Sequence, residues 1–165
     1  MRRGLKWCLL AVILVGGTYA GTLLATPSSG FTGTTLAVAR FGEIDVKNHD
    51  IPADSWQARL KTQGLSDVYV QNNTWAPGGS TGWHTHPGHS LILVTEGAVT
   101  AYEGHDPSCG ARVYSAGTGF VDAGGDHVHL LRNEGTVPAK TIAVQLIPAN
   151  ATRRIDMPAP GNCPF

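Results

Sequence analysis

The sequence has few charged residues and lacks several patterns that mark common functions. Asp, Glu, Lys and Arg make up 15% of its 165 residues, and the formal net charge is zero. No basic patch is present, which argues against a nucleic acid as partner. A Gly-rich phosphate loop, the turn that carries a nucleophilic serine and a Ser/His/Asp spacing are also absent, so nucleotide chemistry and acyl transfer fit poorly. The lack of a CxxC pair argues against a cysteine-based zinc site.

Cysteine is scarce as well, and the positions of the three cysteines favour export. Cys8 lies in an apolar N-terminal run, which leaves Cys109 and Cys163 in the body of the chain. An even number of cysteines in an oxidising compartment predicts a disulfide, and two free thiols are the alternative. The bond would close a loop of about 55 residues and contribute about 3–4 kcal/mol on the chain-entropy account. It would also tether the Pro-rich tail, residues 151–165, which has no periodicity to hold it on a core.

Residues 1–25 resemble an export segment. Arg2, Arg3 and Lys6 precede an apolar run over 7–15, and small residues at 18 and 20 suit cleavage after Ala20. The stretch 7–25 carries no charge and approaches the ~20 residues that span a bilayer as a helix. A removable signal peptide and a retained membrane-anchor helix therefore both remain open. Either one places the domain outside the cytoplasm, secreted or anchored, with membrane contact only through this segment.

The rest of the chain predicts a single all-β domain. Apolar residues make up 42% of the sequence, and 21 glycines and 10 prolines are spread among short apolar runs. Turn signals every 8–12 residues are typical of a sandwich or barrel. We expect a linker over 26–35, the β-sandwich or barrel over 36–150 and the tail over 151–165.

Individual elements follow from local patterns. We expect strands over 36–41, 43–46 and 68–75, the last ended by Pro77-Gly78-Gly79. One short helix is predicted, capped by Asp54 or Ser55 and ended by Gly64. Two hairpins are predicted further on: one over 84–102 that turns at Glu96-Gly97, and one over 127–147 that turns at 133–135.

Histidine carries the strongest functional signal. His84 and His86 form one HxH pair, and His127 and His129 form another. On a strand, residues i and i+2 point to the same face, roughly 6.5–7 Å apart. Two imidazoles placed in this way can bind one ion at the ~2.0–2.1 Å of a Zn–N bond. Strand stability does not require paired histidines, so the two pairs predict a metal site built from separate strands.

The sequence around the first pair resembles the first motif of the cupin superfamily. Residues 77–97 read PGGSTGWHTHPGHSLILVTEG, and Gly78, His84, His86 and Gly97 fall on the motif in register. Residues 117–133 resemble the second motif, in which His129 and Asn133 keep the expected spacing. The resemblance implies a type-2-like cupin with a single jelly-roll, or double-stranded β-helix, barrel. It also implies one divalent transition metal held by His84, His86 and His129.

Two departures from the motifs bear on the site. Ser90 occupies the place of the motif's glutamate and is a poor ligand, so the centre resembles the all-histidine centres of some cupin dioxygenases. In the second motif His127 and His129 flank the expected ligand position, and His127 is either a fourth ligand or a group that orients a ligand. Asp122 and Asp126 could accept hydrogen bonds from the imidazoles, although turn chemistry explains them equally well.

The metal site admits more than one function. Neutral imidazoles suit Fe, Mn, Ni, Cu or Zn, and they leave the ion its full charge, which favours a small anionic ligand or substrate. One reading is a mononuclear non-haem oxygenase, dioxygenase-like, or an isomerase. The alternative is a non-catalytic metal- or small-ligand-binding module of the cell envelope, and a purely structural envelope protein is a third reading. The resemblance also allows a homodimer through edge strands, and fold alone does not choose among these functions.

Overall fold

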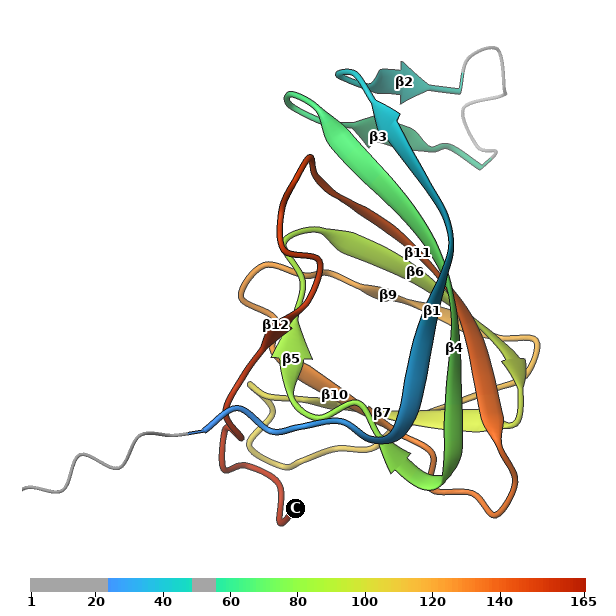
Figure 1. The fold of residues 1–165 in the computed structure, drawn as a ribbon, viewed down its shortest axis with the longest axis vertical. Coiled ribbons are helices and arrows are strands. Elements are labelled where there is room, and N and C mark those ends of the chain that lie inside the picture. The colour runs from blue at the N-terminus through green and yellow to red at the C-terminus, as the bar shows by residue number, and fades with distance from the viewer. Residues whose placement is uncertain (1–23, 49–55) are drawn as a thin grey trace, which may run out of the picture.

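A computed structural model describes residues 24–48 and 56–165 as an antiparallel barrel (Figure 1). The strands are β1 (Ser29–Phe41), β2 (Asp45–Lys47), β3 (Arg59–Lys61), β4 (Ser66–Ser80), β5 (His84–Thr85), β6 (His89–Glu96), β7 (Ala98–Glu103), β8 (Arg112–Ser115), β9 (Gly119–Asp122), β10 (His129–Arg132), β11 (Ala139–Pro148) and β12 (Ile155–Asp156). The predicted all-β barrel is confirmed. The predicted N-terminal signal or anchor falls almost entirely on residues 1–23, outside the described ones. Among the described residues, no helix is long and apolar enough to cross a membrane.

Ten of the strands form one sheet that folds back on itself. One side of the barrel runs in the order β1, β4, β11, β6, β9, and the other runs in the order β12, β5, β10, β7, β8. The two sides join where Arg132 of β10 pairs with Ser80 at the end of β4. Strands β2 and β3 form a separate small sheet beyond one end of the barrel (Figure 1).

Both predicted hairpins are wrong, although the strands and turns themselves are present. β6 pairs with β9 and β11, whereas β7 pairs with β8 and β10. β10 and β11 likewise lie on opposite sides of the barrel. Each turn therefore carries the chain across the barrel. The two crossings meet at Gly97, where a Cβ would lie 2.6 Å from the carbonyl oxygen of Pro138. A turn signal predicts that the chain reverses but does not choose the strand's partner.

Three other local predictions are corrected. Residues 29–35, expected as linker, form the first half of β1 and pair with β4, because Ser, Thr and Gly also suit an exposed edge strand. The predicted helix is wrong where it is described: β3 pairs with β2, and Arg59 and Lys61 both form ion pairs with Asp45 across the strands. Its expected caps, Asp54 and Ser55, lie outside the described residues. β4 does not end at Pro77, because the N–H of Gly78 donates to the Asn133 carbonyl at 2.9 Å.

The barrel interior is apolar at one end and polar at the other. The apolar cluster consists of Trp75, Val94, Val99, Ala101, Leu131 and Ala139. Farther along the same strands, buried inward positions are polar: Gln71 and Asn73 on β4, and Thr141 and Gln145 on β11. Burying polar groups costs free energy unless they are hydrogen-bonded. The polar end is therefore the part of the barrel interior that suits a functional site.

The tail lies against the barrel. A disulfide joins Cys109 to Cys163 with 5.2 Å between their Cα atoms, which confirms the predicted bond. β12, inside the predicted tail, pairs with β5, and Met157 and Cys163 pack on a second apolar cluster of Trp83, Tyr102 and Leu130. The tail is thus part of the wall around β5.

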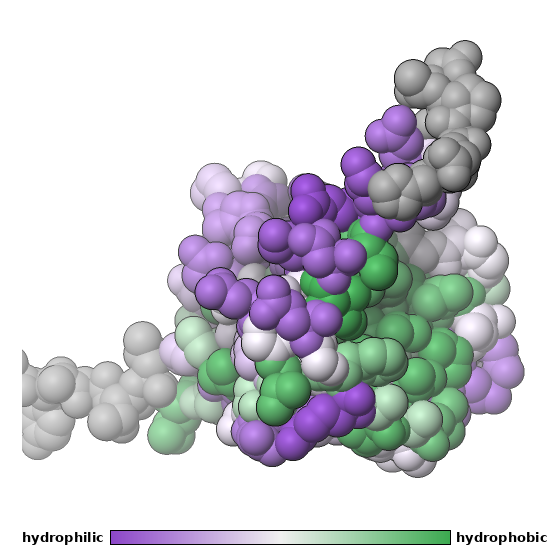
Figure 2. Space-filling model, turned by 90° about the horizontal axis from the view of Figure 1, so that it is seen from above, coloured by the Kyte–Doolittle hydropathy of each residue, from purple (hydrophilic) through white to green (hydrophobic). Residues whose placement is uncertain are grey.

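Hydrophobic side chains also gather on one outer side of the molecule (Figure 2). Leu91 and Leu93 on β6 and Val121 on β9 point outward and are about half exposed or more. The homodimer expected from the sequence remains a prediction.

Candidate metal centre

Three of the four predicted histidines meet inside the barrel. His84 opens β5, His129 opens β10, and the two are directly opposite each other in the ladder. His86 follows in the turn after β5. The ring centroids lie 4.3 Å apart for His84–His129, 4.9 Å for His84–His86 and 5.6 Å for His86–His129. One nitrogen from each of these three buried rings lies within 4.8 Å of the others, an arrangement compatible with a shared metal ion.

Backbone carbonyls fix how the three rings present their nitrogens. The Nδ1 atom lies 2.9 Å from the Gly82 carbonyl in His84, 2.7 Å from the Arg153 carbonyl in His86 and 3.3 Å from the His127 carbonyl in His129. A carbonyl oxygen only accepts, so in His84 and His129 Nδ1 carries the hydrogen and Nε2 keeps its lone pair. This is the usual way in which proteins orient histidines around a metal. Nδ1 of His86 also lies 3.0 Å from the amide nitrogen of Gln145.

The buried surroundings also favour neutral rings. Burial lowers the pKa of His84 well below its usual value, and the neighbouring His129 and Arg154 lower it further. Burial likewise lowers the pKa of His86 to about 4, although the Arg153 carbonyl and Asp122 oppose the shift. A metal ligand must be unprotonated. These two rings therefore offer their lone pairs at neutral pH without competition from protons.

Asp122 is the acidic group beside the three rings. Asp122 lies on β9, directly opposite Ser90 of β6. Its carboxylate oxygens lie 3.6 Å from Nε2 of His86 and 3.6 Å from Nδ1 of His129. Oδ1 accepts the N–H of Gly124, while Oδ2 is buried without a hydrogen-bond partner. A buried, unpartnered carboxylate oxygen is costly unless a cation lies nearby, so this atom fits a metal among the histidines.

Ser90 explains why the carboxylate comes from a different strand. Its side chain is buried, and its Oγ also has no hydrogen-bond partner. The serine leaves the place of the motif's glutamate without an acid, and the cross-strand partner Asp122 supplies one. The sequence indicated Asp122 only as an acceptor for an imidazole or a turn residue. Asp126 is exposed.

His127 does not join the three rings. It is exposed, and its ring centroid lies 5.4 Å from that of His105. Gly124 and Gly125 have φ values of +67° and +69°, so the chain turns just before His127 and β10 begins only at His129. His127 therefore lies beyond the end of β10, where it lines a neighbouring cavity with His105. His89 is also exposed, with Nδ1 2.6 Å from the Ala123 carbonyl.

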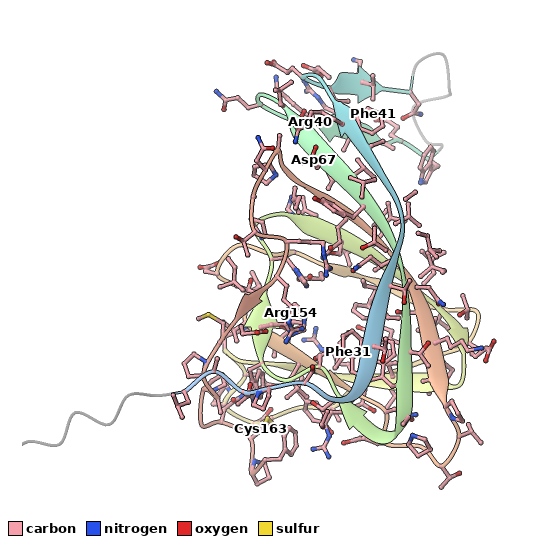
Figure 3. The ribbon with its side chains drawn as sticks, viewed as in Figure 1. Phe31, Arg40, Phe41, Asp67, Arg154 and Cys163 are labelled. Carbon is pink, nitrogen blue, oxygen red and sulfur yellow. A yellow bond between two sulfur atoms is a disulfide. The ribbon has the colours of Figure 1, made fainter. Side chains whose placement is uncertain are left out.

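Two arginines of the tail complete the site, and the sequence analysis missed them. A cavity of about 370 Å³ is lined by the three histidines, Asp122, Arg153 and Arg154, with Phe31 and Ile92 among its apolar walls. Arg154 and Phe31 reach into the barrel from opposite sides (Figure 3). The only signal was an Arg-Arg pair at the start of a tail that we interpreted as tethered chain.

Hydrogen bonds hold both guanidinium groups in place. Arg153 donates to the side-chain oxygens of Gln71 and Gln145 on the inner wall. Arg154 donates to the Thr81 carbonyl and to Asp156, each at 2.6 Å. Burial lowers the pKa of Arg153, but an arginine starts so far above neutral pH that it stays cationic. The cavity therefore combines neutral imidazoles with fixed positive charge.

Comparisons with known proteins agree with this fold. The family model for the cupin domain matches residues 73–145, a range that contains all three clustered histidines. A search of curated proteins finds no match.

Several solved structures are similar to this chain, each at low sequence identity. An oxalate oxidase is 23% identical, with a TM-score of 0.46, over 55% of this chain and 46% of its own. A cupin-like protein from Thermotoga maritima MSB8 is 21% identical, with a TM-score of 0.46, over 56% of this chain and 65% of its own. A double-stranded β-helix protein from Klebsiella pneumoniae subsp. pneumoniae MGH 78578 is 24% identical, with a TM-score of 0.44, over 56% of this chain and 70% of its own.

The chain spans less than half of the oxalate oxidase that it matches. The match to the family model and the antiparallel barrel show that the chain belongs to the cupin superfamily.

Proposed function

We propose that this protein is a metal-dependent enzyme, an oxygenase or an isomerase, that acts on a small carboxylate-bearing molecule inside the barrel. The observation that carries the proposal is the shared cavity of three converging imidazoles and two arginines. Its volume of about 370 Å³ suits a small organic molecule.

The charges in the cavity favour an anionic substrate. A divalent ion on neutral histidines keeps most of its charge, and Asp122 balances only part of it. Arg153 and Arg154 add two positive groups at the wall. Burying this much positive charge is unfavourable unless an anion joins it. A substrate carboxylate would balance this positive charge, and its two oxygens match the planar donor geometry of an arginine.

The chain's own residues have separable roles in this proposal. His84, His86 and His129 would hold the ion, with the Asp122 carboxylate beside them. Arg153 and Arg154 would bind and orient the substrate's carboxylate. Phe31, Ile92 and Phe120 form apolar wall that limits water around the reacting atoms. A bound ion would supply a Lewis acid with positions open to substrate oxygens and to O₂ or water.

The test uses the full chain loaded separately with Fe(II), Mn(II), Ni(II), Cu(II) or Zn(II). Each form is incubated with a panel of small carboxylic acids and diketones, and melting temperature and product formation are measured. We expect at least one carboxylate to raise the melting temperature and to be converted. Both effects should disappear in a variant with His84→Ala and His86→Ala.

Arg154→Met tests the substrate-binding role directly. We expect it to keep the metal but to lose the response to carboxylates, whereas Arg154→Lys should keep part of it. Arg59→Met, in the remote β2–β3 sheet, is the matched control. Binding without turnover for every metal would favour the alternative, a non-catalytic ligand-binding module. No response to any acid with any metal would refute both the enzyme and its substrate class.

We further propose that the domain works outside the cytoplasm. A disulfide such as Cys109–Cys163 persists in oxidising compartments and is rare in the cytosol. The charged and apolar N-terminal sequence supplies a signal or an anchor. Cell fractionation of the tagged protein tests this proposal, and a fully reduced protein found only in the cytosol would refute it.

A further inference from the structure

A second group of side chains with possible metal-ligand atoms lies at the end of β7 and just before β10, outside the three-histidine centre. It consists of Glu103, His105 and His127, with one ligand atom from each within 4.8 Å of the others. The two imidazole rings stand nearly perpendicular, at 86°, with centroids 5.4 Å apart. Rings in this arrangement can direct one nitrogen each toward a common point. Both histidines are exposed, so small side-chain rotations can shorten the remaining gap.

The strand register explains why these residues meet. In the β7–β10 ladder Ala101 is opposite Leu131 and Glu103 is opposite His129. The N–H of Gly104 donates to the Val128 carbonyl at 2.7 Å, which continues the pairing beyond the strands. The next residues in this register are His105 and His127. Because alternate residues share a face, Glu103, His105 and His127 lie on the side of the ladder that carries His129.

Contacts with the segment before β10 and with the C-terminal tail fix the backbone that carries Glu103 and His105. A Cβ at Gly104 would lie 2.9 Å from the Val128 carbonyl oxygen, so glycine permits the close approach of the two segments. Asn162 of the tail donates to the carbonyls of Glu103, at 2.9 Å, and Asp106, at 2.6 Å. The Cys109–Cys163 disulfide ties the same loop to the same tail. The ligand-bearing backbone is therefore preorganised, which reduces the entropy lost on binding.

We propose that Glu103, His105 and His127 form a second site for a divalent transition metal, distinct from the three-histidine centre. Two imidazoles and one carboxylate are donors for Zn²⁺, Ni²⁺ or Cu²⁺, whereas Ca²⁺ and Mg²⁺ prefer oxygen alone. Arg112 lines the adjoining cavity of about 230 Å³. Its positive charge favours hydroxide or another small anion as the remaining ligand.

The two sites are neighbours with separate ligands. His129 and Asp122 line both cavities and so form the wall between them. The inner centre uses His84, His86 and His129, and none of these belongs to the outer group. The inference does not depend on the enzyme's reaction, because it concerns a different set of ligands.

The test counts ions with the full, disulfide-bonded chain. The protein is dialysed to equilibrium against Zn²⁺, and zinc and protein are then quantified. We expect two ions per chain in the wild type, and one in His105→Ala, in His127→Ala and in the double variant with His84→Ala and His86→Ala. Glu103→Gln should also lose one ion. His89→Ala, an exposed histidine of neither group, should keep two.

Cu²⁺ supplies a second readout that separates the sites by spectrum. Electron paramagnetic resonance of the wild type should show two Cu²⁺ signals, one lost in His105→Ala and the other in the inner double variant. A single wild-type ion that both His105→Ala and His127→Ala retain would overturn the inference, as would two ions retained in both variants. Removal of the same signal by outer and inner variants would also overturn it, because the histidines would then share one ion. A failure of the inner site alone would leave the outer ion and its signal in place.

Discussion

Asp122 and Ser90 are opposite each other across β9 and β6 beside the three histidines. The acid that a cupin motif carries on one strand is here supplied from the next strand. This exchange keeps a carboxylate near the imidazoles but changes the backbone that holds it. The carboxylate's contribution to metal binding can be measured with a substitution that keeps its shape.

We expect Asp122→Asn to weaken metal binding by about 10–100-fold, because a charged group beside the ligands is lost. The metal-free variant should be no less stable than the wild type, since a buried, unpartnered charge is removed. Metal titration and thermal melts of both proteins check these two expectations. Asp45→Asn, in the remote β2–β3 sheet, is the control. Equal metal affinity for Asp122→Asn and wild type would contradict the role of this carboxylate.

A second residue-scale effect concerns Asp67, whose pKa is lowered to about 2. Arg40 donates two hydrogen bonds to its carboxylate, each at 2.8 Å, and the backbone N–H of Asn150 donates another at 3.1 Å. The pKa in the folded protein is thus below the ordinary 3.8. The stabilisation from this carboxylate is therefore complete above about pH 4 and is lost as the pH falls toward 2.

The lowered pKa of Asp67 predicts how the thermal stability of Asp67→Asn depends on pH. The melting temperature of the variant should lie below that of the wild type above pH 4, and the difference should shrink as the pH falls to 2. The effect should be modest, because the Arg40 side chain is about half exposed and solvent screens the pair. Thermal melts at a series of pH values provide the measurement. A difference that is constant from pH 2 to 6 would contradict the assigned pKa.

At the scale of elements, the turn between β9 and β10 determines which side chains enter the barrel. Asp122 at the end of β9 points inside, and the turn through Gly124 and Gly125 leaves His127 outside before β10 begins at His129. Both glycines have positive φ, but their surroundings differ. A Cβ at Gly124 would overlap the Gly88 carbonyl oxygen and lie 2.8 Å from that of His86, whereas one at Gly125 meets nothing within 4 Å.

We expect Gly125→Ala to cost about 1–2 kcal/mol in the free energy of unfolding, from the left-handed backbone alone. Gly124→Ala should cost at least about 1 kcal/mol more, because the contacting atoms belong to the backbone and cannot rotate away. Urea denaturation of the two variants and the wild type gives the comparison. Equal costs for the two substitutions would show that the turn is not packed against the His86–Gly88 segment.

The chain crosses the barrel at Gly97 and at 133–135, where the local sequence pattern predicted hairpins. Local patterns located the strands on either side of each turn, but the partners of those strands are far away in the sequence. The alternation of buried residues depends on the nearest neighbours alone. Pairing depends on how the whole sheet closes, and a short local window does not contain that information.

At the scale of the molecule, the disulfide joins the tail to the barrel. It closes a loop that contains β8, β9, β10, β11 and β12, with a sequence separation of 54 between its cysteines. The tail carries Arg153 and Arg154 into the cavity, and its Asn162 contacts the loop after β7. The bond therefore supports both candidate sites as well as the stability of the fold.

We expect the double variant with Cys109→Ser and Cys163→Ser to lose about 3–4 kcal/mol in the free energy of unfolding, because the unfolded chain gains loop entropy. Chemical denaturation without reductant checks the value. Adding reductant should bring the wild type close to the variant and leave the variant unchanged. A variant as stable as the oxidised wild type would contradict this account.

The sequence by itself determined those features that depend on local order. Short apolar runs and turn residues predicted an all-β sandwich or barrel, and the resemblance of residues 77–97 to the first cupin motif implied the barrel. The count of cysteines predicted Cys109–Cys163. Each of these signals is contained in a short segment or in a simple count. Closure of the sheet then brought the segments that carry these signals together in space.

Only the tertiary structure decided which groups share a site. It placed His127 beside His105 and not among the inner rings, because β10 begins only at His129 and His127 lies beyond its end. It also brought Asp122 opposite Ser90 and placed Arg153 and Arg154 in the cavity, from strands and a tail distant in sequence. The physical reason is that side-chain direction follows from the local backbone, whereas proximity follows from the pairing and closure of the whole sheet.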